Sequence, residues 1–209
     1  MYIKIKRILD IAMSIIALII CAIPMLIIAI AIKIEDGKPI IYKSKRMGKN
    51  LEVFDIYKFR SMKTSRKELE SNLSHKDMVT KVGKFIRKTS LDELPQLVNI
   101  LKGDMSFIGP RPWIPEYYEW FTEMQKRRAS VMPGFSGLAQ VKGRNGIGVY
   151  QKIKYDLEYI DNMSFKQDIN LIYETVKTVF SKSNAEITEK GIKEEIRELK
   201  ENKEVSKVG

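Results

Sequence analysis

Residues 11–32 read IAMSIIALIICAIPMLIIAIAI, a run of 22 residues without a charged side chain. A helix rises about 1.5 Å per residue, so this run is long enough to cross the hydrocarbon core of a bilayer. A cleaved secretory signal is the competing interpretation, because basic residues precede the run and Ala29-Ile30-Ala31 resembles a cleavage site. Signal cores span about 7 to 15 residues, so the length favours a retained membrane segment.

Pro24 lies just past the middle of this run. A proline removes one backbone hydrogen bond and its ring crowds the preceding turn, so we expect a kink in the helix. Lys and Arg residues flank the run on both sides, and such residues favour the cytoplasmic face. A helix that bends at Pro24 and returns keeps both flanks on that face, whereas a straight span exports one of them. Charge and proline alone leave a re-entrant helix and a single pass equally open.

The basic charge of the chain is concentrated near the apolar run. The 209 residues carry 37 Lys and Arg against 26 Asp and Glu, a formal net charge of +11, and residues 1–49 hold 9 basic and 3 acidic side chains. This cluster favours anionic membrane lipids, and phosphate-bearing substrates could use the remaining charge. The sequence contains no helix-turn-helix, zinc-finger or aromatic RNA-binding pattern, which argues against a nucleic-acid partner.

A single cysteine and a single histidine restrict the possible chemistry. One Cys forms no intrachain disulfide, and Cys21 and His75 together cannot complete a zinc site. A catalytic metal would therefore be a hard cation bound by oxygen atoms. His75 lies in a polar stretch, and we expect it to be a solvated loop residue rather than a catalytic base.

After the apolar run, the chain alternates short strand and helix patterns. Apolar residues at 40–42 and 51–57 predict a hairpin around the turn at residues 47–50. Residues 63–80 are polar and predict a helix and a loop. An amphipathic helix is predicted from Val82, with Val82, Phe85 and Ile86 on one face that suits either the core or a membrane interface. Helical spacing also predicts one short helix with Leu91, Leu94, Val98 and Leu101 on one face, and an amphipathic helix over 114–129 with Ile114, Tyr118, Phe121 and Met124 inward. Two further helices are predicted, separated near 162–164.

Three further features are a glycine-rich run, a group of aromatic residues and a charged C-terminal tail. The run 133–146 contains four glycines, which predicts a loop of close backbone approach and a strand rather than a helix. Trp113, Tyr117 and Trp120 suit a core, although such residues also favour a membrane interface. Residues 181–209 form a charged tail with a short helical pattern at Ile192, Ile196 and Leu199, to which we assign no chemistry.

Asp92 and Glu93 stand just before a helix whose first turn contains Pro95. Because proline is tolerated in a first turn, Asp92 is expected at or near the N-cap, and Ser90 with Glu93 fits a capping box. The same location suits chemistry, since a carboxylate at a helix N-terminus stays ionised and its neighbour can share a divalent cation or a proton. The residues alone leave both interpretations open.

Arg111 lies between Pro110 and Pro112. The two prolines restrict the backbone on either side, so the guanidinium group is preorganised to bind a phosphate or a carboxylate. An ordinary surface charge is the alternative for an arginine in a turn. The rigid setting of Arg111 leaves both interpretations open.

Five sequence blocks follow the proline-broken segment in a fixed order: KSKRMGKN, VFDIYKFRSM, VGKFIRKTSLDELPQLVNILKGDMSFIGPRP, PGFSGLAQVKGRN and YDLEYIDNMSFKQDI. In this order they resemble the bacterial sugar transferases, also called monotopic phosphoglycosyl transferases, over about residues 1–180. The dense LDELPQL and GPRP motifs carry most of the specificity. The chain resembles the minimal catalytic form of the family.

The resemblance implies a mixed, helix-rich α/β domain that associates with the membrane. The expected parts are a re-entrant helix broken at Pro24 within residues 1–35, a catalytic domain over residues 36–180 and the charged tail over residues 181–209. The expected location is the cytoplasmic face of the bacterial inner membrane. With Mg²⁺, such an enzyme moves a sugar-1-phosphate from a UDP-sugar to undecaprenyl phosphate and releases UMP. The product enters capsule, exopolysaccharide, O-antigen or glycoprotein assembly, where downstream glycosyltransferases are expected partners.

The resemblance also assigns expected roles to individual residues. Asp92 is the expected nucleophile, which forms an aspartyl phosphosugar intermediate, and Glu93 is its partner for Mg²⁺ or for the proton. Arg111 is the expected phosphate clamp. The other positions expected to line the substrate site are Lys58, Arg87, Arg144 and Asp168. Direct transfer without a covalent intermediate is an alternative, and a single-pass anchored binding protein is another.

Three positions depart from the family pattern. Ile23 stands where a serine often precedes the proline, which concerns the hinge of the membrane helix. Ser61 replaces the threonine of KFRTM, and Lys142 stands where an asparagine commonly precedes GRN. These two departures concern the nucleotide or sugar side of the site. The motifs do not specify which sugar is transferred.

Overall fold

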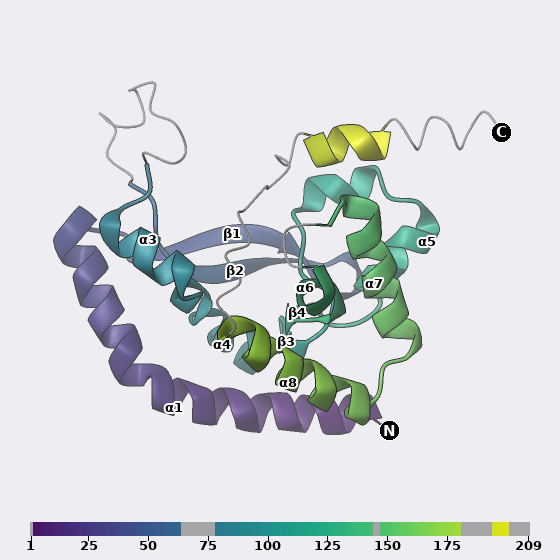
Figure 1. Ribbon diagram of the computed structural model, residues 1–209, viewed down its shortest axis with the longest axis horizontal. Helices are drawn as coiled ribbons and strands as arrows, with labels where there is room; N and C mark the ends of the chain where they lie inside the picture. The colour runs from purple at the N-terminus through teal and green to yellow at the C-terminus, as the bar shows by residue number, and fades with distance from the viewer. Residues whose placement is uncertain (1, 64–77, 144–146, 181–193, 201–209) are drawn as a thin grey trace. The chain divides into compact units, whose positions relative to one another are not determined.

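The computed structural model describes residues 2–63, 78–143, 147–180 and 194–200 (Figure 1). The predictions for His75, Arg144 and Ile192 lie outside the described residues. The helices and strands, with η for a 3₁₀ helix, are α1 (Tyr2–Asp36), β1 (Ile41–Met47), η1 (Lys49–Leu51), β2 (Val53–Phe59), α3 (Lys81–Lys88), η2 (Leu91–Glu93), α4 (Gln96–Lys102), β3 (Ser106–Ile108), η3 (Pro115–Glu119), α5 (Glu123–Lys126), η4 (Arg127–Ala129), β4 (Gly134–Ser136), α6 (Leu138–Gly143), α7 (Val149–Asp161) and α8 (Phe165–Phe180). The predicted helix-rich α/β composition is confirmed.

The chain forms two compact units. Unit 1 contains Met1–Ile8, Lys45–Phe54 and Gly103–Gly209, and unit 2 contains Leu9–Ser44 and Asp55–Lys102. Helix α1 and strands β1 and β2 each run from one unit into the other along the chain.

Helix α1 is long and apolar enough to cross a membrane, and within the described residues it is the one helix with this property. Only 11% of its most apolar 18-residue window is buried. Figure 1 shows a bend along α1, and Pro24 inside the helix provides the physical cause, as predicted. Ile19, Ile20 and Ile23 are among its most exposed side chains. The helix therefore presents an extended apolar surface.

The core of unit 2 joins the end of α1 to the segments that carry the expected nucleophile. Ile28 and Ile32 of α1 pack with Phe59 of β2 and Ile86 of α3. The predicted hairpin is present, because β1 and β2 form a two-stranded sheet. The helix predicted from Val82 is also present as α3. Ile86 is fully buried, whereas the Phe85 side chain is 59% exposed, so the core-facing interpretation fails for Phe85 and the interfacial one stays a prediction.

The inward face of α4 differs from the predicted one. Leu97 and Ile100 are buried, whereas Leu101 is exposed. The predicted stripe began at Leu91, but residues 91–93 form a separate 3₁₀ turn and α4 starts only at Gln96. This interruption changes the helical phase, so the residues of α4 that face the core are not those predicted from Leu91.

Unit 1 contains a small parallel sheet in which Ser106 pairs with Gly134 and Ile108 with Ser136. The close backbone approach predicted from the glycines is confirmed, because a Cβ atom on Gly134 would lie 2.1 Å from the Gly109 nitrogen. The prediction of no helix in this run is wrong, since α6 covers residues 138–143. Its first residue, Leu138, packs into a core with Ile108, Tyr159 and Leu171, and this burial outweighs the local glycine content.

The single helix predicted over residues 114–129 is wrong. The segment forms η3, α5 and η4, and Thr122 starts a new helix through a capping box with Gln125. Met124 is consequently exposed rather than inward. Trp113 and Tyr117 pack with their ring centroids 4.9 Å apart in a buried cluster, as expected for core residues.

The predicted helix pair near residues 162–164 is confirmed as α7 and α8. Part of the tail, residues 194–200, is helical and packs against the aromatic cluster of unit 1. Leu199 is only 1% exposed there. Glu195 accepts a hydrogen bond from the Tyr117 hydroxyl at 2.5 Å and pairs with Lys152 at 2.8 Å. This part of the tail thus belongs to the folded core.

Candidate active site

Asp92 and Glu93 lie in the 3₁₀ turn η2, between α3 and α4. Ser90 precedes the turn with a left-handed backbone, φ 58°, and makes no side-chain capping hydrogen bond. The capping interpretation is therefore wrong: Asp92 lies four residues before the first residue of α4, and the capping box is absent. The Asp92 carboxylate is thus not used to cap α4.

Glu93 forms an ion pair with Lys58 of β2, with 2.5 Å between Oε1 and Nζ. Both side chains are largely buried. An ion pair with little solvent exposure keeps a defined geometry, because few alternative positions are open to either group. The pair joins the hairpin to the turn that carries Asp92.

Asp92 lies in a field set by three neighbouring charges. Burial raises the pKa of its carboxyl above the ordinary value, and Glu93 raises this pKa further. Lys58 and Arg87 act in the opposite direction and lower the pKa of Asp92. The structure therefore brings four of the predicted site residues together in unit 2, and it holds Asp92 as a half-buried carboxyl beside two cations.

Arg87 is oriented by the residue that departs from the KFRTM pattern. Its Nε donates to the Ser61 hydroxyl at 2.7 Å. Because threonine carries the same hydroxyl, the replacement by serine keeps this hydrogen bond available. Serine at position 61 therefore keeps the hydrogen bond that orients Arg87.

The contact between α3 and the Ser61 backbone depends on Thr80 and Gly83. The Thr80 hydroxyl accepts from the Gly83 nitrogen at 2.8 Å and so caps α3, while the Thr80 nitrogen donates to the Ser61 carbonyl at 3.1 Å. A Cβ atom on Gly83 would lie 2.1 Å from that carbonyl oxygen. Gly83 thus permits the close packing that places Arg87 beside Ser61.

Arg111 belongs to unit 1, in the segment that follows β3. The backbone of this segment is fixed at three carbonyl groups within residues 110–113. Pro110 accepts from the Gly134 nitrogen at 2.9 Å, Arg111 from Arg128 Nη2 at 2.7 Å and Trp113 from the Met47 nitrogen at 2.8 Å. The rigid setting that was predicted from the two prolines is therefore reinforced by hydrogen bonds.

Asp168 also belongs to unit 1, where it is buried at α8. Its Oδ2 accepts from the Tyr2 hydroxyl and forms an ion pair with Lys6, both at the start of α1. Its Oδ1 accepts from the Tyr159 hydroxyl at 2.7 Å. The Asp168 carboxylate therefore joins α1, α7 and α8. Its expected role in substrate binding stays a prediction.

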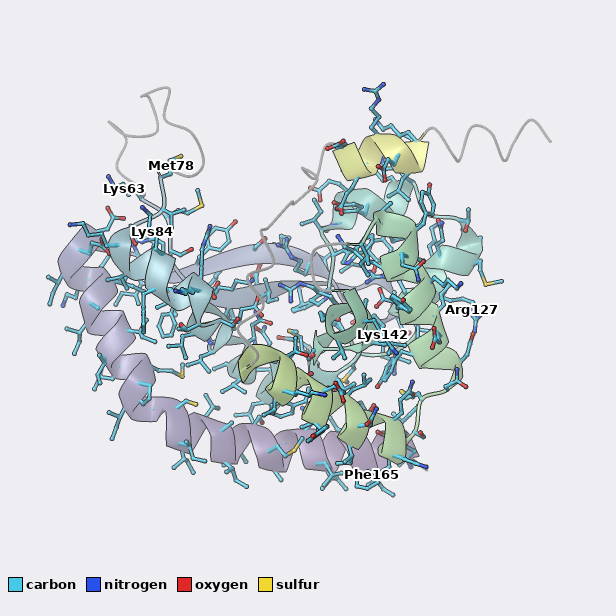
Figure 2. The ribbon with its side chains drawn as sticks, in the orientation of Figure 1. Lys63, Met78, Lys84, Arg127, Lys142 and Phe165 are labelled. Atoms are coloured by element: carbon cyan, nitrogen blue, oxygen red, sulfur yellow. The ribbon has the colours of Figure 1, made fainter. Side chains whose placement is uncertain are left out.

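Sequence reasoning missed the buried pair of Arg128 and Asp156 in unit 1, with 2.6 Å between Nη2 and Oδ2. Arg128 follows Lys126 and Arg127, and such a basic run usually indicates a solvated surface. Nothing in the sequence pairs it with Asp156. Lys142, one of the three positions that depart from the family pattern, is exposed at the end of α6 (Figure 2).

The donor set around Asp92 is compatible with Mg²⁺. This ion is commonly bound by one or two carboxylates, with substrate phosphates and waters completing its shell. Asp92 and Glu93 supply two adjacent carboxylates. The described residues contain no cluster of three or more acidic, Cys or His side chains that could hold a metal ion.

Residues 1–182 match the family of bacterial sugar transferases, and the chain belongs to this family. It is 44% identical over 188 residues to the galactosyl transferase CpsE of Streptococcus agalactiae, covering 83% of this chain and 42% of that protein. It is 40% identical over 174 residues to the uncharacterized sugar transferase EpsL of Bacillus subtilis, covering 83% of this chain and 86% of that protein.

A third relative is the undecaprenyl-phosphate galactose phosphotransferase of Salmonella typhimurium, which is 38% identical over 197 residues. The match covers 86% of this chain and 41% of that protein. The chain therefore spans less than half the length of the galactosyl transferase and of the phosphotransferase, and most of the length of EpsL.

Proposed function

We propose that this protein transfers a sugar-1-phosphate from a UDP-sugar to undecaprenyl phosphate and releases UMP. The observation that carries the proposal is the grouping of Asp92 with Glu93, Lys58 and Arg87 in a chain of the bacterial sugar transferase family. Relatives named as undecaprenyl-phosphate phosphotransferases of galactose and of glucose support the lipid acceptor. A relative named as a UDP-N-acetylgalactosamine-undecaprenyl-phosphate transferase supports the nucleotide donor.

The reaction proceeds in two displacements at phosphorus. In the first, a carboxylate oxygen of Asp92 attacks the β-phosphorus of the UDP-sugar, the bond from that phosphorus to the bridging oxygen breaks, and UMP leaves with the electron pair. In the second, an oxygen of undecaprenyl phosphate attacks the same phosphorus and the Asp92 carboxylate leaves. The product is undecaprenyl diphosphate sugar, and Asp92 is regenerated.

The neighbouring groups match the charge that this reaction handles. Phosphoryl transfer depends mainly on positioning and on neutralising charge at the phosphate oxygens. Lys58 and Arg87 oppose the effect of burial and favour the anionic form of Asp92. Arg111 binds a donor phosphate through its guanidinium fork. Mg²⁺, held by Asp92 and Glu93 together with the phosphates, would supply further positive charge when bound.

The membrane setting follows from α1. We propose that α1 is re-entrant, bends at Pro24 and holds the catalytic residues at the cytoplasmic face of the bacterial inner membrane, next to anionic lipids. The exposed apolar side chains, the bend and the basic residues on both flanks support this arrangement. The polyprenol phosphate would then meet the catalytic site at head-group height, and its product would pass to downstream glycosyltransferases.

The activity is tested with detergent-purified protein, Mg²⁺ and a panel of UDP-sugars, with and without undecaprenyl phosphate. We expect UMP release with one or a few donors and its loss in Asp92→Asn. The matched control is Asp161→Asn, which changes an exposed aspartate of α7 that pairs with Arg127. Release by Asp92→Asn at the wild-type rate would contradict the role of Asp92, and no release from any donor would contradict the activity.

The two-step mechanism has its own test. A covalent intermediate allows labelled UMP to exchange into the UDP-sugar when undecaprenyl phosphate is absent, and it produces ping-pong kinetics. Direct transfer requires both substrates at once and gives no such exchange. Absence of exchange in an active preparation would favour direct transfer, with Asp92 acting only as a base or a metal ligand.

The topology of α1 is tested by cysteine labelling. Lys4→Cys and Lys38→Cys, each combined with Cys21→Ser, place a thiol on either flank of the apolar run. In sealed membrane vesicles of one orientation, a membrane-impermeant maleimide should label both positions from the cytoplasmic side. Labelling from opposite sides would establish a single pass instead.

A further inference from the structure

Among the described residues of unit 1, Arg128 and Asp156 form the most completely buried ion pair, with the two residues 2% and 1% exposed. Arg128 Nε and Nη2 both donate to Asp156 Oδ2, at 3.0 and 2.6 Å. Burying two charges is costly, and an apolar pair of similar volume is often equally stable. The Asp156 Oδ1 atom has no hydrogen-bond partner among the described residues, which makes the pair a poor source of stability.

Among the described residues, the other side-chain hydrogen bonds and ring contacts of Arg128 lie on the segment that carries Arg111. Nη2 donates to the Arg111 carbonyl at 2.7 Å, and Nη1 donates to the Tyr118 hydroxyl at 2.8 Å. The guanidinium carbon lies 4.3 Å from the centroid of the Trp113 ring, within the range of a cation–π contact. One buried cation thus contacts three positions of the segment 111–118.

We propose that Arg128, oriented by Asp156, is a positioning residue that sets the direction in which Arg111 presents its guanidinium group to the diphosphate of the donor. This inference rests on the proposed function. Pro110 and Pro112 restrict the backbone on both sides of Arg111. The hydrogen bond from Arg128 Nη2 holds the Arg111 carbonyl in one orientation. It thereby fixes the peptide plane between Arg111 and Pro112.

An arginine is required for this arrangement. Its planar fork places separate nitrogen atoms opposite Asp156, the Arg111 carbonyl and the Tyr118 hydroxyl at the same time, and its flat face lies against Trp113. A lysine has all its donors on one nitrogen atom, which cannot reach the three acceptors from one position. Arg128→Lys therefore keeps the charge and loses the geometry.

The test is a double-mutant cycle on kcat/KM for the UDP-sugar. We expect Arg128→Lys to lower kcat/KM about tenfold or more, mainly through a higher KM for the donor. In an Arg111→Ala background the same change should have little further effect, because Arg128 acts through Arg111. Arg127→Lys, on the neighbouring arginine at the outer edge of unit 1, is the matched control and should leave kcat/KM unchanged (Figure 2).

The outcomes separate the inference from the proposed function. If the losses from Arg128→Lys and Arg111→Ala multiply, Arg128 acts independently of Arg111 and the inference is overturned. If Arg111→Ala alone leaves the donor KM unchanged, the clamp role fails and the inference fails with it, whereas UMP release still supports the reaction. Tyr118→Phe, which removes one acceptor of Arg128 and keeps the ring, should give a smaller loss that is also absent in the Arg111→Ala background. This second variant tests the inference even if Arg128→Lys does not fold.

Discussion

The Tyr159 hydroxyl donates to Asp168 Oδ1 at 2.7 Å and thereby joins α7 to α8. The same hydroxyl lies 3.3 Å from the carbonyl oxygen of Ile108, the last residue of β3. Arg111 follows three residues later in the chain. Because Lys6 and Tyr2 bind the other oxygen of Asp168, one carboxylate connects the start of α1 with the strand that leads to Arg111.

We predict that Tyr159→Phe lowers the free energy of unfolding by about 1 to 3 kcal/mol, because a buried carboxylate oxygen loses a donor. Thermal unfolding in detergent measures the loss, and the donor KM should stay unchanged. Tyr173→Phe, on an exposed tyrosine of α8, is the control. An unchanged melting temperature combined with an altered donor KM would instead indicate that Asp168 contacts the substrate.

We predict opposite pH shifts for two variants beside Asp92. An ionised nucleophile is required, so kcat/KM should rise with pH as Asp92 loses its proton. Lys58→Gln removes a charge that lowers the pKa of Asp92, and the rise should move to higher pH. Glu93→Gln removes a charge that raises this pKa, and the rise should move to lower pH.

The pH dependence of kcat/KM, recorded from about pH 4 to pH 8, measures both shifts. Lys126→Gln, on a surface lysine of α5 that pairs with Glu123, is the control and should keep the wild-type profile. Shifts of the same sign in Lys58→Gln and Glu93→Gln would rule out Asp92 as the titrating group.

We predict that Gly83→Ala impairs both stability and activity. The new methyl group would lie 2.1 Å from the Ser61 carbonyl oxygen, so α3 must move away and carry Arg87 with it. Gly148→Ala is a matched control, since among the described residues, its chain neighbours aside, no heavy atom lies within 4 Å of a Cβ atom at that position. Melting temperature and UMP release are the measurements, and equal behaviour of the two variants would show that this packing is unimportant.

We predict that the hydroxyl at position 61 is what supports Arg87. Ser61→Ala removes the acceptor of Arg87 Nε and should reduce kcat/KM about tenfold, while Ser61→Thr keeps an acceptor and should remain close to wild type. Steady-state kinetics with the donor varied distinguish the two. Wild-type kinetics in Ser61→Ala would mean that Arg87 does not need this hydrogen bond.

We predict that Leu199→Ala loosens residues 194–200 without loss of transferase activity. The side chain is buried in the aromatic cluster, so its truncation removes apolar contacts between residues 194–200 and that cluster, which contains none of the expected catalytic residues. Hydrogen exchange should become faster over residues 194–200 and around Tyr117. Glu194→Gln, on the exposed side, should exchange as the wild type does, and unchanged protection in Leu199→Ala would contradict the docking.

The sequence was informative where the pattern is local or strongly periodic. The apolar run, Pro24, the hairpin and the helix pair α7 and α8 could all be predicted, because each depends on side-chain periodicity or on a backbone-breaking residue. The grouping of Asp92, Glu93, Lys58 and Arg87 followed from the family resemblance. The role of Ser61 as the acceptor for Arg87 needed the structure, since the two residues are far apart in the chain.

Two of the failures, at Leu101 and at Met124, share a physical cause. A single residue that changes the local backbone, such as Ser90 in its left-handed conformation or Thr122 as a helix cap, shifts every inward position that follows. Periodicity read across such a point therefore selects the wrong face, as it did at Leu101 and Met124. The pairing of Arg128 with Asp156 depends on tertiary packing, for which the sequence contains no local signal.

The packing of Leu199 has a practical consequence for chimeric enzymes. The family match ends at residue 182, yet the buried core of unit 1 extends to residue 199. A graft cut at the family boundary would leave the Tyr117 cluster uncovered and prone to self-association. A junction placed after residue 200 would keep residues 194–200 packed on the Tyr117 cluster.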